Sequence, residues 1–216
     1  MRGFGLFRSP VNHRPKTKGK LAVLAMAGAV LGLSACGSAP PVPEDRYYRL
    51  QAVFAGAAHK SALLAGTIEV DRFVADGLTS ERPVVYSKAG QPNEVKAYHY
   101  NFWIKPPTVM LRDELVSFLR EAKVADVIVT PAMRVQADYV LTGKIKHLEQ
   151  VVGTPHRTML EVELGLRRPT DGKLLFLKSY RQENVSGGPA VGAAVDSLNT
   201  ALSIVYADFL QDLSKK

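Results

Sequence analysis

Apolar residues recur at helical spacing in two stretches of the sequence. One runs from Pro106-Pro107 to about Ala122, and the other runs from Pro189 to about Leu213. Each stretch predicts a helix with one apolar face, and the prolines mark where each helix begins. The apolar positions are Leu111, Leu115, Phe118 and Leu119 in the first stretch, and Val191, Val195, Leu198, Leu202, Val205, Phe209 and Leu213 in the second.

Shorter runs of branched and aromatic residues predict strands. Five short strands are expected first, at residues 46–50, 67–73, 83–87, 95–103 and 124–129. Turn residues at 89–93 indicate a hairpin between the third and fourth of these strands. Three longer strands are expected at 139–151, 157–167 and 173–184. The link Pro169-Thr170-Asp171-Gly172 is a strong turn signal, so these three strands are predicted to form an antiparallel meander.

The middle strand of this meander predicts how the helices pack. Aliphatic residues alternate there with Glu161, Glu163 and Gly165, so one face is apolar and the other is mostly solvated. The last predicted helix supplies an apolar face that can cover it. We therefore predict an α+β fold, in which two main helices pack on one face of a mixed, largely antiparallel sheet. The aliphatic residues are Leu160, Val162, Leu164 and Leu166.

The first 35 residues have the layout of a secretory signal. Six basic residues and no acidic residue precede an apolar run from Leu21 to Leu33. This run is shorter than the ~20 residues that a membrane-spanning helix needs. The residues that follow complete Leu33-Ser34-Ala35-Cys36, which resembles a bacterial lipobox. The resemblance implies cleavage before Cys36 and lipidation of that residue, while an ordinary secretory leader with a coincidental cysteine is the alternative.

Removal of this leader changes the charge of the protein. The whole chain has 28 basic and 20 acidic residues, whereas residues 36–216 have 22 and 20. The nearly balanced charge excludes the basic surface that nucleic-acid binding needs. Cys36 is the only cysteine, so no disulfide is expected. We expect a cleaved signal at 1–35, a proline-rich lipidated tether at 36–45 and a single periplasmic domain at 46–216.

Candidate catalytic chemistry is sparse. The histidines do not form a metal-binding motif, and no G-x-S-x-G motif is present. The acidic pair Glu161 and Glu163 is explained by an exposed sheet face. Ser186-Gly187-Gly188 is explained by a turn that leads into the last helix. We therefore expect no catalytic residue, no metal site and no cofactor.

Several short motifs together resemble the ABC-type transport auxiliary lipoproteins, the PqiC-like family. They are the lipobox, Tyr48-Arg49-Leu50, the aromatic run Tyr98 to Trp103, the Pro106-Pro107 entry into a helix, and the closing helix. The arginine that usually precedes the tryptophan is Phe102 here. The resemblance implies a fold similar to the amino-terminal domain of TolB.

The resemblance also implies a function. It indicates a periplasmic accessory protein that moves lipids between the two membranes together with an MCE-domain protein and an inner-membrane transport component. Gly37 follows Cys36, and the absence of aspartate at this position favours the outer membrane. The main alternative is a structural or assembly lipoprotein that binds another envelope component. An independent lipid carrier would need an apolar pocket, which the sequence pattern does not predict.

An aromatic cluster is the candidate for partner binding. Tyr98, Tyr100 and Phe102 share one face of a regular strand, and Trp103 lies on the other. Tryptophan and tyrosine are frequent in interface hot spots, so an exposed Trp103 would favour a contact surface. Burial under the neighbouring helix is the alternative. If lipid passes the protein, we expect a homo-oligomer to form the path, because a small domain with a covered sheet has little spare interior.

Overall fold

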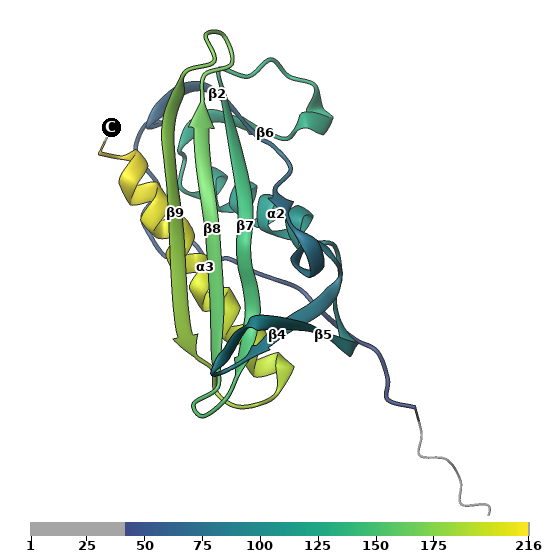
Figure 1. Cartoon of the computed structure of the whole chain (residues 1–216). Helices are drawn as coiled ribbons and strands as arrows, with labels where there is room; N and C mark the ends of the chain where they lie inside the picture. The colour runs from purple at the N-terminus through teal and green to yellow at the C-terminus, as the bar shows by residue number, and fades with distance from the viewer. Residues whose placement is uncertain (1–41, 216) are drawn as a thin grey trace, which may run out of the picture. The chain divides into compact units, whose positions relative to one another are not determined.

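The computed structural model describes residues 42–215 (Figure 1). The lipobox, Leu33 to Cys36, lies outside the described residues. The elements in chain order are β1 (Arg46–Tyr48), β2 (Leu64–Val70), β3 (Val74–Ala75), the short 3-10 helix η2 (Gly77–Ser80), β4 (Pro83–Lys88), β5 (Gln91–Trp103), α2 (Pro107–Glu121), β6 (Ala125–Val129), η3 (Pro131–Met133), β7 (Tyr139–Val152), β8 (Arg157–Arg167), β9 (Leu174–Val185) and α3 (Val191–Leu213).

The long strand β7 organises the sheet. One of its edges pairs antiparallel with β8, which in turn pairs antiparallel with β9. Its other edge is divided among three short parallel partners: β2 near its start, β3 in its middle and β4 near its end. The sheet then continues outward from β2 to β6 and from β4 through β5 to β1. The long pairings are antiparallel and most of the short ones are parallel, so the sheet is mixed.

The predicted fold class is confirmed, since both helices and the meander lie close to their predicted bounds. Three local predictions were inaccurate. The hairpin turn is shorter than residues 89–93, because Lys88 already pairs with Gln91 and Gly90 takes a positive φ of 83°. The second strand is shifted towards the N-terminus and ends at Val70. The parallel strand β3 was missed because two residues carry no periodicity.

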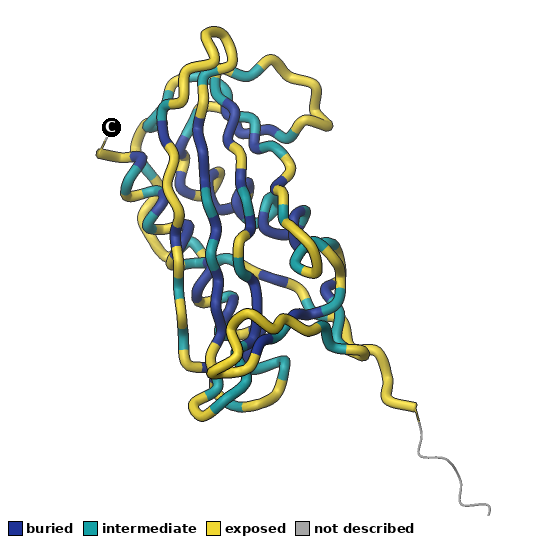
Figure 2. Tube along the Cα trace, in the orientation of Figure 1, coloured by how far each residue is buried: buried dark blue, intermediate teal, exposed yellow. Residues whose placement is uncertain are grey.

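Both helices pack on one face of the sheet and share a single core (Figures 1 and 2). The apolar face of β8 is buried beneath α3, as its alternation predicts. The helix α2 lies against β2 and β6. The helices also contact each other, because the Tyr206 hydroxyl donates to the Leu111 carbonyl at 2.7 Å and the Tyr206 ring meets Phe118 edge-on at 5.7 Å. Burial raises the pKa of Tyr206 well above its ordinary value.

The end of α3 is attached to the edge strand β9 by a polar cluster. The Asp212 carboxylate accepts hydrogen bonds from the Lys178 ammonium and the Tyr180 hydroxyl. Together these bonds lower the pKa of Asp212 from 3.8 to about 2, and the bond from Lys178 has the largest effect. Lys215 pairs with the second carboxylate oxygen at 3.3 Å. The cluster therefore holds the last turn of α3 against the sheet.

Replacement of Gly143 by alanine is expected to destabilise the domain. A Cβ at this position would lie 2.5 Å from the buried ring of Phe73, which leaves no room for a methyl group. Overpacking of this kind costs about 1–3 kcal/mol, measurable by denaturant unfolding. Gly187→Ala is the control, because Gly187 lies outside the helices and strands and no atom beyond its chain neighbours lies within 4 Å of its Cβ position. Equal stability of Gly143→Ala and the wild type would contradict this packing.

Replacement of Asp212 by asparagine is expected to alter the pH dependence of stability. A carboxyl group whose pKa is lower in the folded state stabilises the fold at any pH above its unfolded-state pKa. This stabilisation is lost as the pH falls through the folded-state pKa. The wild type should therefore exceed Asp212→Asn in unfolding free energy at neutral pH, and the difference should shrink between pH 3.8 and about 2. Denaturant unfolding of both proteins across this range is the measurement. A difference that stays constant would show that Asp212 does not titrate as described.

Candidate functional site

The aromatic run of β5 is divided between the core and the surface. Trp103 is 1% exposed and belongs to the core, as the alternative interpretation of this cluster had it. Beside this run, the pairing of β5 with β4 shifts register. Phe102 pairs with Pro83, and Ala97 pairs with Val85. Between these two pairs, β5 advances by five residues while β4 advances by two. Such an irregularity interrupts the regular alternation of side chains.

Tyr98 is half-buried and supports the junction of three elements. Its ring lies 4.5 Å from that of Tyr86, and its hydroxyl donates to the Gln150 side chain at 2.7 Å. The buried Gln150 amide in turn donates to the Pro189 carbonyl at 3.1 Å, just before α3. Burial raises the pKa of Tyr98. These contacts give Tyr98 a structural function in addition to the predicted contact function.

The exposed part of the cluster lies where β5 pairs with β1. Tyr47, 56% exposed, stacks on Phe102 with ring centres 5.8 Å apart. The Arg82 guanidinium lies 5.6 Å from the centre of the Tyr47 ring, and its Nε donates to the Trp103 carbonyl at 3.1 Å. We call Tyr47, Arg82, Tyr100 and Phe102 the aromatic edge, with Tyr100 40% exposed further along β5. Arg82 thus lies beside Trp103, although in the sequence it directly precedes β4 and is distant from Trp103.

The other polar candidates have structural partners. Glu163 accepts from Lys146 at 2.9 Å, which lowers its pKa, and Glu161 faces Arg181 at 3.4 Å. The Ser186 hydroxyl donates to the Gly188 carbonyl within the turn before α3. Pro189 precedes the first residue of α3 by two positions instead of occupying it.

Two absences apply to the described part of the chain. Within residues 42–215 no group of three or more His, Cys, Asp or Glu side chains could hold a metal ion. In the same range no helix has both the length and the apolar character required to span a membrane.

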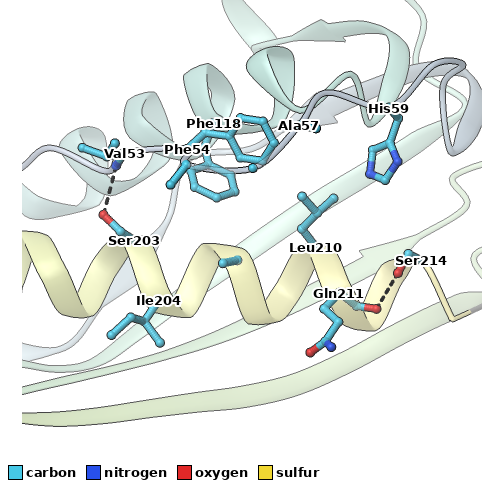
Figure 3. A pocket seen from close by; sticks show the side chains of 13 residues that line it. Val53, Phe54, Ala57, His59, Phe118, Ser203, Ile204, Leu210, Gln211 and Ser214 are labelled. Atoms are coloured by element: carbon cyan, nitrogen blue, oxygen red, sulfur yellow. Dashed lines mark hydrogen bonds between the residues drawn. The ribbon is translucent and has the colours of Figure 1, made fainter.

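A groove that the sequence did not predict lies between α3 and the irregular segment 49–63, which we call the strap (Figure 3). Its volume is about 460 Å³. Phe54 and His59 point from the strap towards α3, and Leu210 points from α3 towards the strap. Phe118 of α2 forms the base of the groove and meets the Phe54 ring edge-on at 5.2 Å.

The strap is attached at both ends of the groove. On one side, the amides of Gln51, Ala52 and Val53 donate to side chains of the two helices. On the other side, the His59 amide donates to the Ala122 carbonyl at 3.1 Å. Residues 54–58 bridge these attachments and include only one large side chain, Phe54. A phenylalanine within the run Ala55-Gly56-Ala57-Ala58 is the one sequence signal that could have indicated such a cover.

Comparison with solved structures supports the fold. A protein from Xanthomonas campestris of the DUF330 family is 16% identical, with a TM-score of 0.65, and the match covers 76% of this chain and 92% of that one. A second structure, of an uncharacterized protein, is 15% identical, with a TM-score of 0.62 over 79% and 99% of the two chains. The predicted similarity to the amino-terminal domain of TolB is not confirmed. No curated protein matches the chain.

The family comparison covers most of the domain. The sequence pattern described as the ABC-type transport auxiliary lipoprotein component matches residues 48–208, from the end of β1 into the last turns of α3. This range contains the strap, the helix α2, most of the groove lining and most of the aromatic edge. The chain therefore belongs to the family of ABC-type transport auxiliary lipoprotein components.

Proposed function

We propose that this protein is a non-catalytic accessory subunit of an intermembrane lipid transport system of the MCE and ABC type. The family match over residues 48–208 is the observation that carries the proposal, because it associates the domain with an ABC-type transport system. An MCE-domain protein and an inner-membrane transport component are the proposed partners. A homo-oligomer around the lipid path belongs to the same proposal.

The proposed location is the periplasmic face of the outer membrane. The lipobox Leu33 to Cys36 supports a lipid anchor on Cys36, and Gly37 supports sorting to the outer membrane. Several acyl chains, each contributing ~0.8 kcal/mol per buried methylene, suffice to hold a folded domain on a bilayer. The proline-rich residues 36–45 then serve as a tether between the anchor and the domain.

Replacement of Cys36 by serine is expected to remove the protein from the outer membrane. Serine has no thiol on which the lipid can be attached, so full-length precursor or soluble periplasmic protein should accumulate. Membrane fractionation together with the intact mass of the protein measures this result. Unchanged recovery in the outer-membrane fraction would contradict anchoring through Cys36.

The aromatic edge is the proposed contact surface for the partner. Tyr100→Ala and Phe102→Ala are expected to reduce recovery of the MCE-domain protein in affinity purification from the native envelope. Exposed aromatic side chains can each contribute ~2 kcal/mol or more to an interface, which corresponds to a loss of more than tenfold in affinity. Trp103 is omitted because its replacement would open a cavity in the core.

Leu177→Ala is the matched control for this experiment. Leu177 is 57% exposed, compared with 40% for Tyr100, and lies on β9, which β8, β7 and β4 separate from β5. Full partner recovery with both folded edge variants would move the contact elsewhere on the domain. Recovery of only cell-wall or assembly proteins by the wild type would favour a structural lipoprotein instead.

A further inference from the structure

The groove under the strap has the dimensions of a single lipid chain. From Ser203 to Ser214 the α3 side of the groove extends over about 16 Å of helix, at about 1.5 Å per residue. An acyl chain in one leaflet occupies about half of a ~30 Å hydrocarbon core, or ~15 Å. The volume of about 460 Å³ also lies within the range of small-ligand pockets. The groove therefore fits one extended chain along α3.

The lining of the groove is apolar along its length and polar at one end. Val53 and Ile204 are 60% and 37% exposed, which is costly for aliphatic side chains without an occupant. The Ser203 hydroxyl accepts the Val53 amide. His59 on the strap and Ser214 at the end of α3 face the same end of the groove in Figure 3. This arrangement suits a ligand with an apolar body and a polar end.

Basic side chains continue from the polar end. Lys60 follows His59 directly, and with Arg120 and Lys123 it lines a second hollow of about 320 Å³. Lys60 and Lys123 are exposed, and no ion pair holds either of them within the described part of the chain. Both ammonium groups are therefore available to an anion.

One acidic residue, Asp126, also lines the hollow, against the three basic residues. Its carboxylate accepts the Gly66 amide at 2.7 Å. The last carbonyls of α2 accept backbone amides, including that of His59 on Ala122, which weakens the negative end of the helix. The Arg120 guanidinium donates to the Ile128 carbonyl through two nitrogens. Glu121 is exposed at the end of α2 but does not line the hollow.

We infer that this composite site binds an anionic lipid, with one acyl chain in the groove and the phosphate at Lys60 and Lys123. The inference names the substrate class of the proposed function and rests on it. The strap covers the chain, and Phe54 and Phe118 form its aromatic wall. Charge complementarity favours an anionic lipid over an uncharged occupant, because the site combines the apolar groove with the ammonium groups of Lys60 and Lys123, which no ion pair holds within the described residues.

Photochemical labelling of the purified lipidated protein tests this site. The protein is reconstituted in phosphatidylcholine vesicles that contain phosphatidylglycerol with a photoactivatable diazirine on one acyl chain. Adducts are then located by mass spectrometry of peptides. We expect them on residues 53–59 and 204–214, and we expect weaker labelling by the matching phosphatidylcholine probe.

Two variants separate the groove from the hollow. Ala207→Trp fills the groove from an exposed position on α3 and should reduce labelling about tenfold, as loss of a few buried methylenes predicts. Thr200→Trp, exposed on the same helix but outside the groove, is the matched control. The double variant Lys60→Gln and Lys123→Gln should reduce phosphatidylglycerol labelling about fivefold relative to phosphatidylcholine labelling.

Several outcomes would overturn the inference. Labelling of Ala207→Trp equal to that of Thr200→Trp would exclude the groove, and equal labelling of the wild type by both probes would exclude selection by charge. A bifunctional cross-linker that joins the straps of two protein copies, in vesicles where no lipid adduct forms, would assign the groove to a second copy. The assay contains no partner, so absent labelling with intact partner recovery would refute only the lipid site. Labelling without partner recovery would refute only the proposed function.

Discussion

The division of one edge of β7 among three strands is the constraint on which the rest of the fold depends. Its other edge is satisfied along nearly its whole length by β8, which follows it in sequence. The divided edge requires β2, β3 and β4 to arrive in parallel and in order, each with a short register. Parallel neighbours need long connections. The helix α2 lies in the connection from β2, β3 and β4 to β7, and the strap lies in the connection from β1 to its parallel partner β5. The groove is therefore built from connections between parallel strands.

Local periodicity predicted the elements that have strong patterns. The alternation of Leu160, Val162, Leu164 and Leu166 predicted the buried face of β8, and the helical spacing of apolar residues predicted α2 and α3 within a few residues. These patterns report local geometry and one buried face. They carry no information about which distant strand lies alongside, so the parallel pairings of β7 remained hidden.

The candidate site was less accessible to sequence analysis for the same reason. Alternation along β5 places Trp103 opposite Tyr100, but it does not say which face of the strand is covered, so the burial of Trp103 could not be read from the sequence. Arg82 could not be placed beside Tyr47 without the strand order. The groove depends on the strap, whose small residues are typical of an ordinary loop. Only the structure shows that its backbone amides donate to side chains of a helix.

The strand order also has a consequence for how the chain acquires its structure. β1 pairs with residues near Asn101, and β2 pairs with β6 and β7, so the N-terminal strands have no partner until much later segments are present. The meander and α3 make most of their contacts among themselves. In a chain that emerges from its N-terminus, β1 and β2 therefore wait longest for their neighbours, and non-local pairing of this kind slows folding. The strap between them is also completed late, because its amides bind Asn199 and Ser203 of the last helix.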